Sequence, residues 1–274
     1  MARPPVYDLV TAAGDYPPWD GPPRRTVVIC SHMRSGSTLL GEALREAGGV
    51  GTALEYFHRG FRPTLQARWG AASLDDYVRA VHRHRTDPSG VLGVKLFWMD
   101  LEDLAHERDP EGQPPEGQRL ATSTSADDYR RIFALVRDIF PNPTFVHLRR
   151  QDRVRQAVSH LTAIRTGLWR SIDGDEREAS GPADYDYERI GRIIAAARRA
   201  HAHWAGLFAA LGVQPYAITY EQLARDYQGT LGGLLRFLGA ASGEAPPLRT
   251  RPQADAASEA MAIRFVKEDA ARRA

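Results

Sequence analysis

A short segment with one arginine, several hydroxyls and a glycine carries the clearest chemistry in this sequence. Residues 31–38 read SHMRSGST, follow the apolar run at residues 27–30, and lead directly into a helical pattern of apolar residues. A strand, a tight polar loop and a helix in this order aim backbone N–H groups and a helix N-terminus at one point. We therefore predict an anion-binding loop, whose binding residues are Arg34, Ser35, Gly36, Ser37 and Thr38.

This loop resembles a Walker A motif but departs from it in an informative way. In the pattern G-x-x-x-x-G-K-[ST] the first glycine would fall on Ser31 and the lysine on Ser37, so only Gly36 and Thr38 match. The positive charge lies inside the loop instead, on Arg34. Such a loop suits a phosphate or phosphosulfate better than a Mg-bound triphosphate. A solvated, serine-rich turn after a buried strand is the alternative.

Length and composition limit the classes of protein that remain. The 274 residues suffice for one domain, with or without appendages, and a formal net charge of +2 gives no strong nucleic-acid footprint. No apolar run approaches the roughly 18 residues of a membrane span, and the N-terminus lacks the apolar core of a signal peptide. The single cysteine, Cys30, excludes an intrachain disulfide. We expect a cytoplasmic protein without a nucleic-acid partner or a membrane span.

Short apolar runs alternate with helical patterns along the chain. Each run is flanked by glycine, proline or charge, and after the first they lie at residues 91–98, 144–148 and 216–219. This alternation predicts βαβ units, and hence an α/β fold with a central parallel sheet flanked by helices on both faces.

Composition also divides the chain into regions. Residues 1–25 are rich in proline and glycine and are predicted to form an arm, while residues 26–274 are predicted to form a single domain. Two stretches, residues 107–126 and 171–184, are predicted to be loops, the second a mobile loop or lid.

Further polar side chains stand near the predicted strand ends. Glu55 follows the first helical pattern, and Lys95 lies within the second apolar run. Residues 148–152, LRRQD, end a strand in a basic turn, and the next helix carries Ser159. Arg34 and Lys95 are expected at the ends of their strands. Because ligands bind beyond the carboxyl ends of parallel strands, we expect both on one rim of the sheet.

In chain order, the pieces RSGSTLL, EYF, GVKLFW and R-x-D…QAVS…WR resemble the Stf0-type sulfotransferases, from about residue 27 to 265. The resemblance implies a P-loop-like sulfotransferase fold. It also implies an enzyme that moves a sulfuryl group from 3′-phosphoadenosine 5′-phosphosulfate, a co-substrate and not a tightly bound cofactor, to a hydroxyl. By analogy with the family, the chain would form a homodimer.

The resemblance also implies roles for individual residues. The loop with Arg34 would hold the 5′-phosphosulfate. Arg150, with Arg149 beside it, and Ser159 would hold the 3′-phosphate. Glu55 matches the proposed general base of the family. These roles place the donor between the first loop and the turn after the third strand.

Elementary chemistry supports the same reading. The donor carries several negative charges, which Arg34, Lys95 and one or both of Arg149 and Arg150 can meet without a metal. Lys95 is expected at the phosphosulfate and, with Arg34, is predicted to be catalytic. A carboxylate that accepts the proton of an alcohol is worth roughly 10²–10⁴-fold in rate, and Glu55 is the residue predicted to do so.

Several alternatives stay open from sequence alone. His58 competes with Glu55 as the base, and Lys95 could be a solvated lysine. Three residues could contact ligand or merely pack: Trp169, Arg170 and Gln253. The acceptor would be a hydroxyl of a carbohydrate, a glycolipid or a small natural product. Other functions are a P-loop kinase or nucleotide hydrolase, or a non-catalytic adenosine-nucleotide-binding module.

Overall fold

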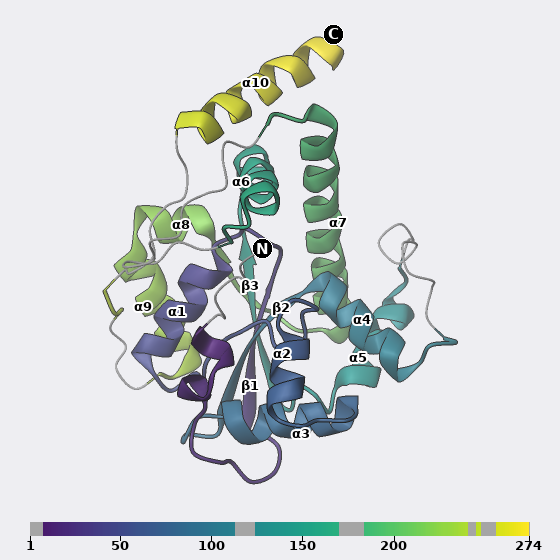
Figure 1. Ribbon diagram of the computed structural model, residues 1–274, viewed down its shortest axis with the longest axis vertical. Helices are drawn as coiled ribbons and strands as arrows, with labels where there is room; N and C mark the ends of the chain where they lie inside the picture. The colour runs from purple at the N-terminus through teal and green to yellow at the C-terminus, as the bar shows by residue number, and fades with distance from the viewer. Residues whose placement is uncertain (1–7, 113–123, 170–183, 241–244, 248–255, 274) are drawn as a thin grey trace.

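The computed structural model describes residues 8–112, 124–169, 184–240, 245–247 and 256–273 (Figure 1). Its sheet has the order β2-β1-β3-β4, and every strand pairs in parallel with its neighbours. The strands are β1 Arg25–Ser31, β2 Val91–Phe97, β3 Pro143–Arg149 and β4 Tyr216–Thr219. The predicted α/β fold with a central parallel sheet is therefore confirmed.

Helices cover both faces of this sheet. They are α1 Ser37–Ala47, α2 Arg62–Arg68, α3 Leu74–Arg85, α4 Trp98–Arg108, α5 Ala126–Val136, α6 Arg153–Thr166, α7 Tyr187–Leu211, α8 Tyr220–Arg225, α9 Tyr227–Leu238 and α10 Ala256–Arg273. Because side chains alternate along β1, Val27 and Ile29 join one apolar core with residues of α1 and α9. Val28 and Cys30 face the opposite core, which α3, α4, α5 and α7 complete.

Most sequence boundaries fall within a residue or two of the observed ones. The predicted strand at residues 91–98 ends at Phe97, because the Asp100 carboxylate accepts the Phe97 N–H at 3.1 Å and α4 starts at Trp98. The loop predicted at residues 107–126 overlaps helices at both ends, since α4 continues to Arg108 and α5 begins at Ala126. Residues 113–123 of this stretch lie outside the described residues. Of the loop predicted at residues 171–184, all but the last residue lies outside the described residues.

The N-terminal arm is described from residue 8. It forms two short 3₁₀ helices, Asp8–Val10 and Ala12–Gly14, and then runs to β1. The arm packs on the body: the Tyr16 N–H donates to the His84 carbonyl and the Trp19 N–H to the Arg83 carbonyl, each at 2.9 Å.

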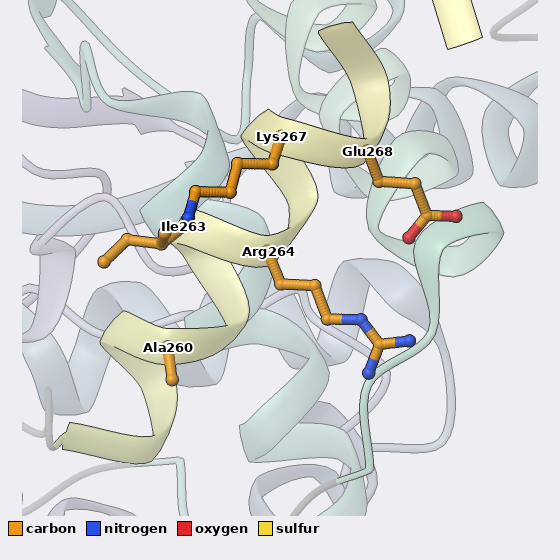
Figure 2. Close-up of a pocket in the computed structure, with 5 residues that line it drawn as sticks. All are labelled: Ala260, Ile263, Arg264, Lys267 and Glu268. Atoms are coloured by element: carbon orange, nitrogen blue, oxygen red, sulfur yellow. The ribbon is translucent and has the colours of Figure 1, made fainter. Parts of the chain in front are cut away.

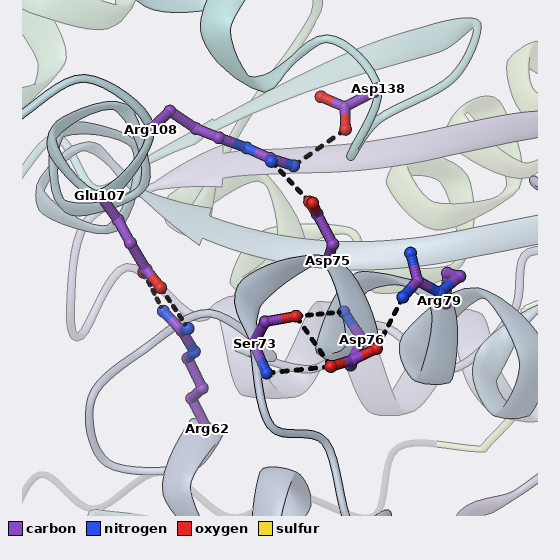
Figure 3. A network of polar contacts seen from close by, with 8 residues as sticks. All are labelled: Arg62, Ser73, Asp75, Asp76, Arg79, Glu107, Arg108 and Asp138. Carbon is purple, nitrogen blue, oxygen red and sulfur yellow. Dashed lines mark hydrogen bonds and ion pairs between the residues drawn. The ribbon is translucent and has the colours of Figure 1, made fainter.

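Ion pairs tie α2, α3 and α4 together at the surface (Figure 3). Arg62 forms a bidentate pair with Glu107, and Arg108 reaches Asp75 at 2.5 Å and Asp138 at 2.9 Å. Exposed pairs of this kind contribute little stability each, so they mainly fix how these helices lie against one another.

The C-terminal helix α10 packs on α6 and α7 at one end of the molecule (Figure 1). A hollow of about 640 Å³ lies along it, and the residues that line it are Ala260, Ile263, Arg264, Lys267 and Glu268 (Figure 2). None of the predicted site residues lines this hollow. Within the described part of the chain, none of the helices combines the length and the apolar character that crossing a bilayer requires.

Candidate active site

The loop between β1 and α1 has a backbone that depends on one glycine. Gly36 precedes α1 at φ +88°, and a Cβ there would lie 2.8 Å from the Tyr220 ring. Arg34 also has a positive φ, +61°, which is uncommon for a residue with a side chain. Such backbone conformations are costly and concentrate at functional sites. The observed strand, loop and helix therefore have the geometry expected of an anion site.

Side chains from α6 hold this loop in shape. Gln156 Nε2 donates to the Met33 carbonyl at 2.9 Å and to Ser35 Oγ at 3.0 Å. Ser35 Oγ in turn donates to the His32 carbonyl at 2.6 Å. The Ser35 hydroxyl is thus used in hydrogen bonds within the loop and to α6. We therefore expect Ser35 to contact an anion through its backbone N–H. Gln156 lies in the QAVS segment, but sequence reasoning gave it no role.

The structure brings Arg34 together with the residues predicted to hold the 3′-phosphate. Arg34 Nε donates to Ser159 Oγ at 2.9 Å, and Arg34 also donates to the Trp169 carbonyl. Arg150 donates to the Arg34 carbonyl at 3.4 Å. Arg149, one residue earlier, is exposed at the end of β3. Of the two adjacent arginines, Arg150 is therefore the one that faces the loop.

The turn that carries Arg150 is itself fixed by β4 and α8. The Glu221 carboxylate accepts the N–H groups of Gln151 and Asp152 at 3.0–3.1 Å. The Arg150 guanidinium lies over the Tyr220 ring, 4.6 Å from its centroid. Neither Tyr220 nor Glu221 was singled out from the sequence, because nothing local marks their contact with a turn some 70 positions earlier in the chain.

Positive charge accumulates at the loop. Burial, and then the nearby Arg150, lower the pKa of Arg34 to about 10. Burial also lowers the pKa of Arg150. Both groups stay charged at neutral pH, so an oxyanion bound between them would offset their mutual repulsion.

A buried ion pair forms the second part of the site. Lys95 Nζ lies 2.9 Å from Glu55 Oε1, and the two residues are 2% and 7% exposed. Lys95 is not at the end of its strand as expected, but two residues inside it, where its N–H donates to the Leu54 carbonyl at 3.0 Å. Its side chain runs against Gly41 of α1. The reading of Lys95 as a solvated lysine is therefore wrong.

Two further titratable groups lie near Glu55. His58 Nδ1 accepts the Gly60 N–H at 3.0 Å, and burial lowers the pKa of His58. Burial, with a contribution from the charge of Glu55, raises the pKa of Asp100 to about 8. Asp100 was not singled out from the sequence. Its carboxyl caps α4, and its Oδ1 is buried without a hydrogen-bond partner.

Four buried histidines lie side by side at the loop, one of them, His32, within it: His32, His147, His160 and His201. The His32 ring lies 6.2 Å from His160 and 6.4 Å from His201, and His147 Nε2 is 3.1 Å from His201 Nδ1. Burial is the first cause that lowers all four pKa values, to between about 2 and about 4. Among the described residues, no group of three potential ligands is placed to hold a metal ion.

Trp169 is the last described residue before a gap. The residue is 46% exposed, and its ring centroid lies 5.8 Å from that of His160 in an edge-to-face arrangement. Trp169 therefore stands at the site, in contact with Arg34. Arg170 and Gln253, the other two residues expected either to contact ligand or to pack, lie outside the described residues.

The fold and the site define a P-loop-like α/β protein. Its loop after β1 carries Arg34 and lacks the Walker lysine, and a second arginine, Arg150, follows the adjacent strand β3. Comparison with protein families names the family. The model of the Stf0 sulphotransferases matches residues 26–268, so the chain belongs to that family.

Curated relatives agree with this family. The chain is 29% identical over 270 residues to the trehalose 2-sulfotransferase of Mycobacterium tuberculosis (strain ATCC 35801 / TMC 107 / Erdman), covering 89% of this chain and 95% of the relative. It is 27% identical to the trehalose 2-sulfotransferase of Mycolicibacterium smegmatis, over 88% and 94% of the two chains.

Solved structures are more distant. A sulfotransferase from Alicyclobacillus acidocaldarius aligns with 89% of this chain and 92% of its own, at 15% identity and a TM-score of 0.46. The sulfotransferase domain of the Synechococcus PCC 7002 olefin synthase aligns with 92% and 98%, at 16% identity and a TM-score of 0.39.

Proposed function

We propose that this sulfotransferase takes its sulfuryl group from 3′-phosphoadenosine 5′-phosphosulfate and passes it to a hydroxyl, with Glu55 as the general base. The observation that carries the proposal is the hydrogen bond from Arg34 Nε to Ser159 Oγ at 2.9 Å. It joins the anion loop to the helix predicted to bind the 3′-phosphate, so that one ligand with two anionic groups can contact both.

On this proposal the loop N–H groups, Ser37 and Thr38 bind the 5′-phosphosulfate, and Arg34 supplies the positive charge. Arg150, assisted by Ser159, takes the 3′-phosphate. Arg34 links the two parts of this site, because it belongs to the loop and also contacts Ser159 and Arg150, the residues proposed for the 3′-phosphate.

The chemical step is an in-line displacement at sulfur. The acceptor oxygen forms a bond to sulfur while the bond from sulfur to the bridging phosphate oxygen breaks, and adenosine 3′,5′-bisphosphate leaves. Negative charge grows on the bridging oxygen, where fixed donors and cations stabilise the transition state. Glu55 accepts the acceptor's proton, so charge and protons balance.

In this proposal Lys95 acts both on the base, Glu55, and on the donor. Its ion pair holds the Glu55 carboxylate in place in a site that water barely reaches, with Glu55 7% exposed. When Glu55 takes the proton and becomes neutral, the Lys95 charge is no longer offset by its partner and can act on the phosphosulfate. Arg34 and Lys95 are then catalytic together with Glu55.

The acceptor is a hydroxyl of a carbohydrate, a glycolipid or a small natural product. The names of the two mycobacterial relatives make trehalose the first compound to test. A panel of sugars, glycolipids and phenols incubated with labelled donor and read by mass spectrometry would identify it.

Donor binding can be tested without an acceptor. Calorimetric titration in EDTA should show saturable binding of adenosine 3′,5′-bisphosphate and much weaker binding of ATP. A requirement for Mg²⁺, or a preference for ATP, would instead favour a P-loop kinase or nucleotide hydrolase. Binding with no turnover on any acceptor would favour the non-catalytic module.

A further inference from the structure

The residue proposed as the base stands on a segment without regular secondary structure. Between α1 and α2, Leu54 makes an isolated bridge to Val94, and its carbonyl accepts the Lys95 N–H at 3.0 Å. These contacts fix one side of the segment to β2. The other side needs a separate support, because a base must lie within hydrogen-bond reach of the proton that it takes.

That support comes from the N-terminal arm. The Thr52 hydroxyl lies 3.2 Å from the Tyr16 hydroxyl, and the Tyr56 hydroxyl donates to the Thr52 carbonyl. The Tyr16 N–H is itself tied to the His84 carbonyl of α3. The arm therefore contacts the Glu55 segment directly at Thr52, before Glu55. The Thr52 carbonyl in turn holds Tyr56, after Glu55.

A partly buried cluster of charges anchors the arm next to this segment. The Asp15 carboxylate accepts three hydrogen bonds from Arg68 and lies 3.2 Å from Arg85, whose side chain is fully buried. The Arg85 guanidinium lies against the Tyr56 ring, 5.7 Å from its centroid, and donates to the Gly14 carbonyl at 2.8 Å. The buried Arg85 guanidinium thus pairs with a carboxylate of the arm, and it packs against Tyr56, the residue that follows Glu55.

The arm precedes the part of the chain that the family model matches, which begins at residue 26. We propose that Asp15 and Tyr16 are positioning residues, which hold the Glu55 segment so that the carboxylate meets the acceptor hydroxyl. The inference rests on Glu55 being the base, as proposed above. Small misplacements of a reacting group carry large kinetic costs, up to about 10²-fold for 1 Å.

The first test compares Tyr16→Phe and Asp15→Asn with Asp20→Asn. Asp20 lies on the same arm, is almost fully exposed and pairs with Arg83 at 3.6 Å, so it is the matched control. With labelled donor and the acceptor that the panel identifies, Tyr16→Phe and Asp15→Asn should lower kcat by about tenfold. The KM for donor and the Kd for adenosine 3′,5′-bisphosphate should stay within about twofold, because the anion loop is untouched.

Wild-type kcat in Tyr16→Phe, or an equal loss in Asp20→Asn, would overturn the proposal. Asp15→Asn leaves Arg85 with a buried charge and can fail to fold; Tyr16→Phe removes one oxygen and keeps the test valid, with a melting curve for each variant.

The second test is a double-mutant cycle with Glu55→Gln. If the arm acts through Glu55, Tyr16→Phe should cause no further loss of kcat in the Glu55→Gln background. Full additivity would show that the arm acts elsewhere and would overturn the inference. The two proposals fail separately. Full activity of the Glu55→Gln variant would reject Glu55 as the base. A low kcat of Glu55→Gln together with a wild-type kcat of Tyr16→Phe would reject only the positioning role of the arm.

Discussion

At the scale of single residues, the two adjacent arginines after β3 separate into different environments. Arg150 is half-buried, lies over Tyr220 and reaches the Arg34 carbonyl, while Arg149 is exposed. The family resemblance pointed to Arg150, with Arg149 beside it, as the residue for the 3′-phosphate, whereas the charge of the two arginines did not separate them. The geometry favours Arg150, and this preference can be measured.

Arg150→Ala should lower the affinity for adenosine 3′,5′-bisphosphate by roughly tenfold or more, since a hydrogen bond to a charged group is worth about 1.5–3 kcal/mol. Adenosine 5′-phosphate, which lacks the 3′-phosphate, should lose much less affinity. Arg149→Ala is the neighbouring control and should change both affinities little. Equal losses for the two nucleotides in a calorimetric titration would place the 3′-phosphate elsewhere.

Lys95→Met should lower kcat by at least tenfold, because it leaves the Glu55 carboxylate buried without its partner and removes a positive charge from the transition state. Donor binding should weaken as well if the ammonium reaches the phosphosulfate. Steady-state kinetics with labelled donor give both quantities. An unchanged rate would remove Lys95 from the catalytic residues.

At the scale of elements, the sequence predicts what is local and misses what depends on distant contacts. The strand, loop and helix around Arg34 were predictable because apolar periodicity and Gly36 mark them within twenty residues. The Lys95–Glu55 pair and the hydrogen bonds of Gln156 to the loop were not, because they join segments 40 to more than 120 positions apart. No local pattern reports such proximity.

The four buried histidines, one each from β3, α6, α7 and the loop, illustrate the same limit and lead to a prediction about pH. Each is neutral when folded, with a pKa between about 2 and about 4, whereas unfolded histidine titrates near 6.5. Below pH 6.5 the unfolded chain therefore binds more protons, and stability falls with falling pH.

For each such histidine, the free energy of unfolding falls by about 1.4 kcal/mol for every unit that the pH drops, between pH 6.5 and the pKa of the folded state. Urea unfolding between pH 7 and 5 should show this loss, and His147→Phe should reduce its slope. A stability that does not change over this range would contradict neutral burial of the four rings.

At the scale of the whole molecule, the net charge is only +2, yet two arginines, Arg34 and Arg150, lie together beyond the ends of β1 and β3. Binding of adenosine 3′,5′-bisphosphate to this region should raise the free energy of unfolding by mass action, by about 2.7 kcal/mol at a hundredfold excess over Kd. Thermal melts with and without EDTA would show it, and a shift that vanishes in EDTA would contradict metal-free binding. The homodimer and the cytoplasmic location stay predictions.

The most direct measurement of the central claim compares wild type with Glu55→Gln, using labelled 3′-phosphoadenosine 5′-phosphosulfate and the acceptor panel in EDTA. The wild type should yield a sulfated product. Glu55→Gln keeps the size of the side chain but loses the base, and should cut turnover by roughly 10²–10⁴-fold while leaving nucleotide affinity nearly unchanged. Turnover of Glu55→Gln within a few-fold of wild type would reject Glu55 as the base and make His58 the next residue to test. No transfer from this donor to any acceptor would contradict the account as a whole.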